Sequence, residues 1–197
     1  MYCGAELCAK GIKFRFTFGF FAVWAILIIG YGSSETAAIT MISCLLHELG
    51  HIGAMKLSGV KVRRLVFYSG GIALTSDPPT EYTDIRREIM ILSAGCAVNI
   101  IIFSAAYFSG STLWALVNLS LALFNLLPFS PLDGGRIIKA LASHICPTAD
   151  IGGAQKIFDI IFGTAAAAFF IARGNINFTL PLTLAMIILE GIADKSI

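Results

Sequence analysis

The chain has 197 residues, of which 57% are hydrophobic and only 13% charged, and its net charge is +2 at pH 7. Soluble domains carry about 25% charged residues, so this chain has too few charges to cover a surface that faces water. We therefore expect one membrane-embedded domain over residues 1–197. The small net charge argues against nucleic-acid binding, and five scattered cysteines argue against a disulfide framework.

Six apolar segments each come near the length that crosses a bilayer. They cover residues 16–31, 37–57, 89–109, 113–129, 157–172 and 178–192. No small-x-small cleavage pattern follows the first segment, which favours a retained helix over a signal peptide. The pattern predicts an all-α membrane protein with about six transmembrane helices. Fewer spans combined with re-entrant pieces are the alternative.

The distribution of basic residues supports six spans. If the segments alternate across the membrane, 13 of the 14 lysines and arginines lie on one side, and only Arg173 lies on the other. Loops rich in lysine and arginine stay in the cytosol. Both termini are therefore expected in the cytosol.

The longest connection, residues 57–88, has the composition of a β-hairpin. A β-rich run from Val60 to Tyr68 is followed by the turn signal Ser69-Gly70-Gly71 and by a possible partner strand, Ile72–Thr75. We predict a small hairpin at the cytosolic interface. A basic interfacial loop held by anionic lipid is the alternative.

A metal-site pattern lies in the second apolar segment, in His47-Glu48-Leu49-Gly50-His51. Histidines four residues apart lie on one face of a helix and can bind one ion. Glu48 is offset around the helix, where it can take a proton from water that the metal activates. Ionisable groups within a membrane segment are costly and usually functional. The pattern predicts one zinc ion bound by His47 and His51, with Glu48 as the catalytic carboxylate.

A catalytic zinc needs a third protein ligand, and either Asp133 or His144 could supply it. Asp133 is favoured because two prolines and two glycines in residues 125–136 break the helix beside it. Broken backbone at membrane depth must face protein or a water-filled cavity. An interfacial Asp133 that pairs with Arg136 is the alternative.

These motifs together resemble the site-2 protease family of membrane metalloproteases, peptidase family M50. Besides the histidine motif, the matching pieces are Asn125-x-x-Pro128, Leu132-Asp133-Gly134 and Ala94-Gly95-Cys96-Ala97-Val98-Asn99, in which Cys96 stands where proline is usual. The resemblance covers residues from about 37 to 140, and Cys96 is expected to be a packing difference.

The resemblance implies that His47, His51 and Asp133 bind zinc, that Glu48 is catalytic and that Asn125 positions the substrate or polarises its carbonyl. The six-span layout is similar to the branch that contains the sporulation stage IV protein FB. Members of that branch cut membrane-associated regulatory proteins, such as a sigma-factor precursor. We therefore expect a bacterial cell-membrane protein that contacts lipid, a membrane-associated protein substrate and a regulatory partner.

Three other functions fit the sequence less well. A metal transporter or sensor needs a polar path through several spans, whereas the ionisable groups gather at one depth on two segments. A prenyl-protein protease uses a glutamate as its third ligand, and no second motif supplies one. An inactive scaffold does not explain Glu48. Asp159 and Glu190 lie near segment ends, where the pattern favours interfacial positions.

Overall fold

The computed structural model describes residues 4–9, 12–17, 25, 34–60, 62–68, 71–76, 84–130 and 132–172. The helices that position the site are α2 (Ser34–Leu57), α3 (Ile85–Phe108), α4 (Thr112–Asn125), α5 (Asp133–Ile145) and α6 (Ile151–Ala172). The strands are β1 (Gly4–Ala9), β2 (Ile12–Thr17), β3 (Val62–Tyr68) and β4 (Gly71–Ser76).

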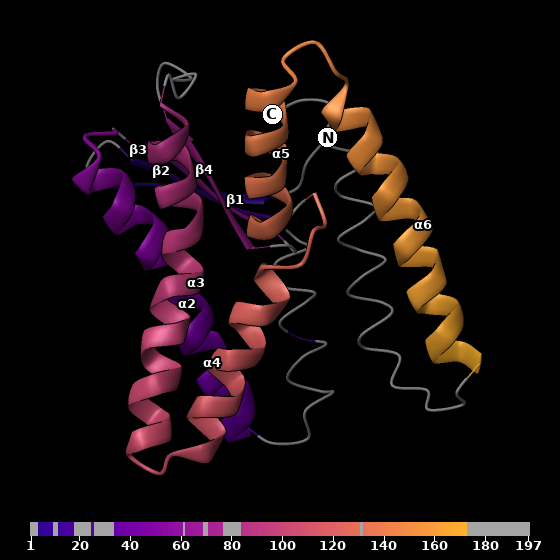
Figure 1. Ribbon diagram of the computed structural model, residues 1–197. Coiled ribbons are helices and arrows are strands. Elements are labelled where there is room, and N and C mark those ends of the chain that lie inside the picture. The colour runs from indigo at the N-terminus through magenta and orange to yellow at the C-terminus, as the bar shows by residue number, and fades with distance from the viewer. Residues whose placement is uncertain are drawn as a thin grey trace.

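The described helices form a bundle of roughly parallel and antiparallel rods (Figure 1). α3 packs against α2 along one side and against α4 and α5 along the other. α4 and α5 follow each other end to end and together run alongside α3, and α6 packs against α5. The break between α4 and α5 therefore lies inside the bundle.

The predicted apolar segments match the described helices closely in the middle of the chain. The predicted segments 37–57, 89–109 and 113–129 correspond to α2, α3 and α4. Within the described residues, α2 and α3 are long and apolar enough to cross a membrane, and α4 is a shorter apolar helix. The predicted segment 178–192 and nearly all of segment 16–31 lie outside the described residues. A total of six spans therefore stays a prediction.

The predicted all-α fold with one small hairpin is confirmed only in part, because the described residues also form a four-stranded sheet in the order β1-β2-β3-β4. β3 and β4 are antiparallel and occupy the stretch in which the sequence predicts a hairpin. β2 pairs in parallel with β3 and antiparallel with β1, so the hairpin is one half of a larger sheet. The predicted first span begins inside β2. Its sequence, Ile12-Lys13-Phe14-Arg15-Phe16-Thr17, alternates apolar and polar residues as strands do.

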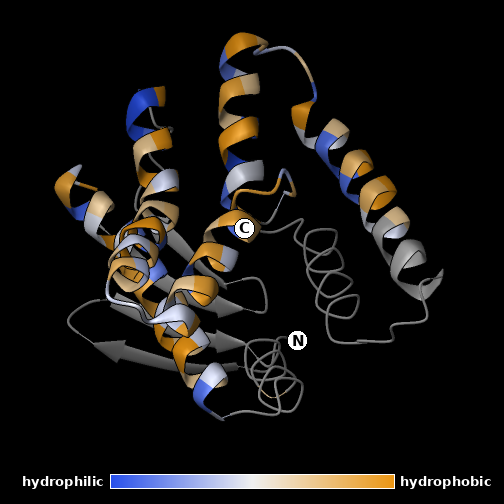
Figure 2. Cartoon of the chain, turned by 60° about the horizontal axis from the view of Figure 1, so that its bottom comes forward, coloured by the Kyte–Doolittle hydropathy of each residue, from blue (hydrophilic) through white to orange (hydrophobic). Residues whose placement is uncertain are grey.

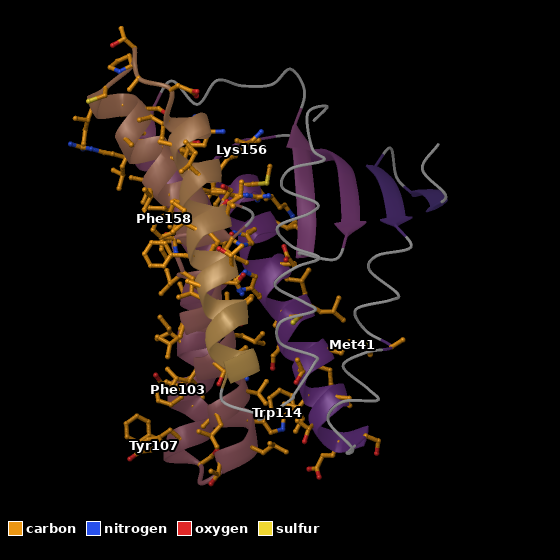
Figure 3. The ribbon with its side chains drawn as sticks, turned by 90° about the vertical axis from the view of Figure 1, so that its right-hand side faces the viewer. Met41, Phe103, Tyr107, Trp114, Lys156 and Phe158 are labelled. Carbon is orange, nitrogen blue, oxygen red and sulfur yellow. The ribbon has the colours of Figure 1, made fainter. Side chains whose placement is uncertain are left out.

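The outer surface of the bundle is strongly apolar. Figure 2 shows hydrophobic residues along α3 and α4, and large side chains are exposed there, among them Ile101 (67%), Phe108 (86%), Leu116 (57%) and Leu123 (60%). Many large apolar side chains exposed on neighbouring helices suit lipid rather than water. Figure 3 shows Tyr107 and Trp114 at one end of the bundle and Lys156 near the other. Tyrosine and tryptophan favour membrane interfaces.

Polar side chains lie inside the bundle instead. Ser43 of α2, Asn99 of α3 and Asn118 of α4 are all 0% exposed. The Asn118 amide donates to the Ser43 hydroxyl at 3.0 Å and so joins α4 to α2. Interhelical hydrogen bonds of this kind stabilise membrane bundles by about 0.5–2 kcal/mol each.

Replacing Asn118 with Ala should destabilise the bundle by about 0.5–2 kcal/mol, because it leaves the buried Ser43 hydroxyl without this donor. The stability can be measured by unfolding the protein in mixed micelles. Adding Ser43→Ala to Asn118→Ala should cost less than the sum of the two single changes. Ser104→Ala, which removes an exposed hydroxyl bonded only to the Ile100 carbonyl of its own helix, is the matched control. Additive effects of the two buried changes would contradict the proposed link.

Candidate metal centre

His47 and His51 lie on the buried stripe of α2. Their exposed fractions are 4% and 6%, and their neighbours on the stripe are Thr40, Ser43, Ala54 and Met55. These positions recur every three or four residues, which is the spacing of one helix face. The bundle therefore orients both imidazoles inward. Between them, Gly50 meets the Ala94 carbonyl of α3, where an added Cβ would lie only 2.8 Å from the oxygen.

Three ligand atoms converge at this point. The Nε2 atoms of His47 and His51 lie 3.0 and 3.1 Å from Oδ2 of Asp133 and 3.2 Å from each other. Asp133 is itself buried, with 7% of its surface exposed. Of the two third ligands that the sequence allowed, the structure brings Asp133 to the histidines, whereas His144 is exposed in the last turn of α5.

The spacing of these atoms fits a small tetrahedral metal ion. Ligand atoms about 2.0–2.1 Å from a tetrahedral zinc are separated from one another by about 3.3–3.4 Å. The observed separations of 3.0–3.2 Å are close to that value. Two imidazoles and one carboxylate also match the donors that zinc prefers, and a catalytic zinc uses three protein ligands. The two histidines and the aspartate therefore fit a bound zinc ion.

The protonation of His51 strengthens this conclusion. Its Nδ1 lies 2.8 Å from the carbonyl oxygen of Ile91, which can only accept a hydrogen bond. Nδ1 must therefore donate, and Nε2 of the neutral ring carries a lone pair. That lone pair faces the carboxylate oxygen of Asp133, a second acceptor. The contact is favourable only when a cation, either a proton or a metal ion, lies between them. The Ile91 carbonyl orients the ring as outer-shell partners of metal sites do.

Asp133 reaches the histidines because the chain folds tightly before α5. Asp133 is the first residue of that helix, and the next two residues are glycines. A Cβ on Gly134 would collide with the Leu126 carbonyl, and one on Gly135 would collide with the Phe129 carbonyl. Only glycine allows this approach of backbone to backbone. The two glycines beside Asp133 thus place it within reach of the histidines.

α6 holds the same loop from the other side. Asp159 accepts hydrogen bonds from the Ser130 amide, 3.2 Å from each carboxylate oxygen, and from the Ser130 hydroxyl. One turn earlier, the Gln155 amide donates to the Gly135 carbonyl at 2.9 Å. Asp159 is only 7% exposed, so its carboxylate is buried against this loop, and its interfacial depth stays a prediction. The sequence offers no local signal for either contact, because both depend on how α6 packs.

α3 closes the site. An added Cβ on Gly95 would come closer than 3.0 Å to Nε2 of both histidines, so the bare backbone of α3 lies directly against the ligand atoms. The next residue, Cys96, is 2% exposed, and its thiol donates to Oδ2 of Asp133 at 3.7 Å. Cys96 therefore contacts a candidate ligand, which is more than the packing difference that the sequence suggested.

The other two predicted residues have different surroundings. Glu48 is half-buried and close enough to His51 for their charges to interact. Asn125 ends α4, and its amide donates to the Leu121 carbonyl of its own helix at 3.0 Å. That bond orients the side chain without linking it to the three ligand atoms.

A helix that carries two histidines four residues apart, with a third ligand from a separate segment, is the arrangement of a metallopeptidase site. Residues 109–172 match the sequence model for Peptidase family M50. A zinc metalloprotease of Methanocaldococcus jannaschii is 32% identical over 160 residues, which cover 71% of this chain and 43% of the relative. The solved structure of the site-2 protease from Methanocaldococcus jannaschii shares the fold, with a TM-score of 0.75 and 23% identity over 99% of this chain and 96% of that one.

The chain is therefore similar to peptidase family M50 through the residues that its sequence model matches, and it is similar to zinc metalloproteases over a longer stretch. The resemblance to site-2 proteases that its motifs suggested agrees with the family match and with the shared fold. The chain spans less than half the length of the curated relative, 43% of it, so its own activity is addressed as a proposal below. Its place in the branch of the sporulation stage IV protein FB stays a prediction.

Replacing Gly95 with Ala should lower zinc binding by at least tenfold, because the new methyl group would occupy space beside both Nε2 atoms. Zinc content after dialysis against a graded chelator series measures the effect. Gly53→Ala is the matched control, since a Cβ there meets nothing within 4 Å. Equal zinc affinity in the two variants would contradict the location of the metal beside Gly95.

Replacing Asp159 with Ala should weaken zinc binding about three- to tenfold, because the loop that carries Asp133 loses its hydrogen bonds to α6. Asp159→Asn, which keeps an acceptor oxygen, should restore most of the affinity. Thr164→Ala on the same helix is the control, since its hydroxyl bonds only to carbonyls of its own helix. Loss of thermal stability with unchanged zinc affinity would show that Asp159 does not position Asp133.

Proposed function

We propose that the chain is an intramembrane zinc metalloprotease that hydrolyses peptide bonds of membrane-associated proteins near the cytosolic face. The observation that carries the proposal is the convergence of His47, His51 and Asp133 on one point within an apolar bundle. A buried cluster of this kind has a high energetic cost without a cation. The similarity of the chain to zinc metalloproteases supports zinc as that cation.

In this proposal His47, His51 and Asp133 hold the metal, and Glu48 carries the protons. Zinc, when bound, supplies Lewis-acid polarisation of the scissile carbonyl and makes a water molecule acidic near neutral pH. Glu48 accepts one proton from the attacking water as its oxygen joins the carbonyl carbon. It then gives that proton to the leaving amine as the carbon–nitrogen bond breaks. Glu48 precedes His51 by three residues on α2, a spacing that makes their side chains neighbours and supports a position for the carboxylate near the site.

Asn125 would polarise the substrate carbonyl or fix the substrate backbone in this mechanism. Its place at the end of α4, beside the break that leads to Asp133, supports that role. A substrate helix must unwind before its carbonyl can be attacked. β4, an edge strand of the described sheet, offers unpaired backbone groups on which an extended segment can form an added strand.

The orientation follows from the charges. Thirteen of the fourteen basic residues would face the cytosol, with both termini on that side, and the exposed apolar helices would contact lipid. We infer one domain over residues 1–197, with a catalytic core at about 37–140, in a bacterial cell membrane. Membrane-associated regulatory proteins, such as sigma or anti-sigma factors, are the proposed substrates, and a membrane partner would regulate their cleavage.

Replacing Glu48 with Gln should reduce peptide-bond hydrolysis at least a thousandfold while leaving zinc bound, because the amide cannot take the proton from water. Comparing membrane proteomes of cells that carry the wild type and this variant would also reveal fragments that depend on the enzyme. Glu35→Gln, on the exposed first turn of the same helix, is the matched control.

Asp133→Ala completes the comparison, since it should lose the metal as well as the activity. Full hydrolytic activity of the Glu48→Gln protein would contradict the proposed mechanism. Unchanged zinc content in the Asp133→Ala protein would remove that residue from the ligand set.

A further inference from the structure

A groove of about 460 Å³ lies between α3 and α5, outside the metal cluster. α3 contributes Ile85, Glu88 and Leu92 to its walls, and α5 contributes Arg136, Lys139, Ala140, Ser143 and His144. None of these residues has a role in the mechanism above.

The groove begins beside the metal cluster. Leu92 precedes Gly95 by three residues on α3, and Arg136 follows Asp133 by three residues on α5. Three residues of helix rise about 4.5 Å, so the nearest walls of the groove are one turn from the ligand atoms. The far end lies at Ile85, the first residue of α3, and at His144, in the last turn of α5. The groove thus runs from about one helical turn away from the ligand residues to the ends of α3 and α5 that carry Arg86, Arg87 and His144.

The length of the groove suits a short extended peptide. The helix from Asp133 to His144 rises about 16 Å, and an extended chain covers that distance in about five residues. A peptide whose scissile bond lies at the metal would therefore place its next five residues along Arg136, Lys139 and His144.

The charge of the groove favours an acidic occupant. Arg136 and Lys139 are cationic, His144 and Ser143 can donate hydrogen bonds, and Glu88 is the one acid among the lining residues. Glu88 interacts with the charge of Lys139 and offsets part of it. Over the lining residues that the structure describes, two cationic side chains and one carboxylate give a formal charge of +1.

We propose that this groove binds the five substrate residues on the cytosolic side of the cleaved bond and selects segments that carry aspartate or glutamate. The inference rests on the proposed protease function and adds a substrate class to it. An anionic phospholipid is disfavoured, because the groove offers only three apolar side chains for an acyl chain and adjoins the metal cluster. Complementary charge of this kind tunes specificity more than total affinity.

The test uses the full zinc-loaded chain with Glu48→Gln, so that bound peptide is not cleaved. Two fluorescein-labelled probes, Leu-Ala-Asp-Ala-Asp-Ala-Asp and its counterpart with Asn in place of each Asp, are titrated in neutral micelles and followed by anisotropy. The acidic peptide should bind about three- to tenfold more tightly, and the preference should shrink at high salt.

Variants locate the preference in the groove. Lys139→Glu should abolish it, Lys139→Gln should reduce it, and Glu88→Gln should enlarge it. Arg86→Glu is the matched control, because Arg86 is exposed in the first turn of α3 outside the groove walls and its change should leave the preference nearly intact. An equal loss in the Arg86 and Lys139 variants would indicate bulk charge and overturn the proposal.

Two further outcomes are decisive. If the protein with unaltered groove residues binds the two probes equally tightly, the groove does not select acidic substrates. The same conclusion follows if the Lys139 variants change only the binding to phosphatidylglycerol vesicles. The proposed function is tested separately by cleavage. A wild-type protein that cuts membrane peptides without regard to acidic residues would retain the protease function and lose only this inference.

Discussion

The convergence of two imidazoles and a carboxylate in an apolar interior is the constraint that organises this molecule. Three ligand atoms lie 3.0–3.2 Å apart, and at least one pair consists of two acceptors when the rings are neutral. Such a group is stable in a bundle only with a cation and with fixed neighbours. The glycine on α3, the turn before α5 and the contacts from α6 all serve to hold that geometry.

The sequence predicted the candidate ligands because their signals are local. Four-residue spacing places His47 and His51 on one helix face, and the prolines and glycines around Asp133 mark a break that must face the interior. The middle helices follow from hydrophobic length for the same reason. These features depend on a few neighbouring residues, so they can be predicted without knowing how distant segments pack.

Other features depend on contacts between distant segments. The sequence of β2 alternates apolar and polar residues, but its partner β3 lies about fifty residues away. The apolar run that follows β2 favours a helix, so the sequence did not predict the strand. The position of Asp159 near a segment end does not predict its hydrogen bonds to Ser130, because these depend on how α6 packs. The contact between the Cys96 thiol and Asp133 likewise depends on how α5 packs against α3. The cationic groove arises from two helices whose lining residues are far apart in sequence.

The long separation between the ligands has a consequence for biogenesis. His51 and Asp133 are 82 positions apart, and Asp159, which secures the loop of Asp133, is translated later still. A nascent chain that has inserted only α2 and α3 therefore carries two histidines and no complete site. The complete set of ligands can be held in place only after the residues of α6 have been translated, because Asp159 anchors the loop that leads to Asp133.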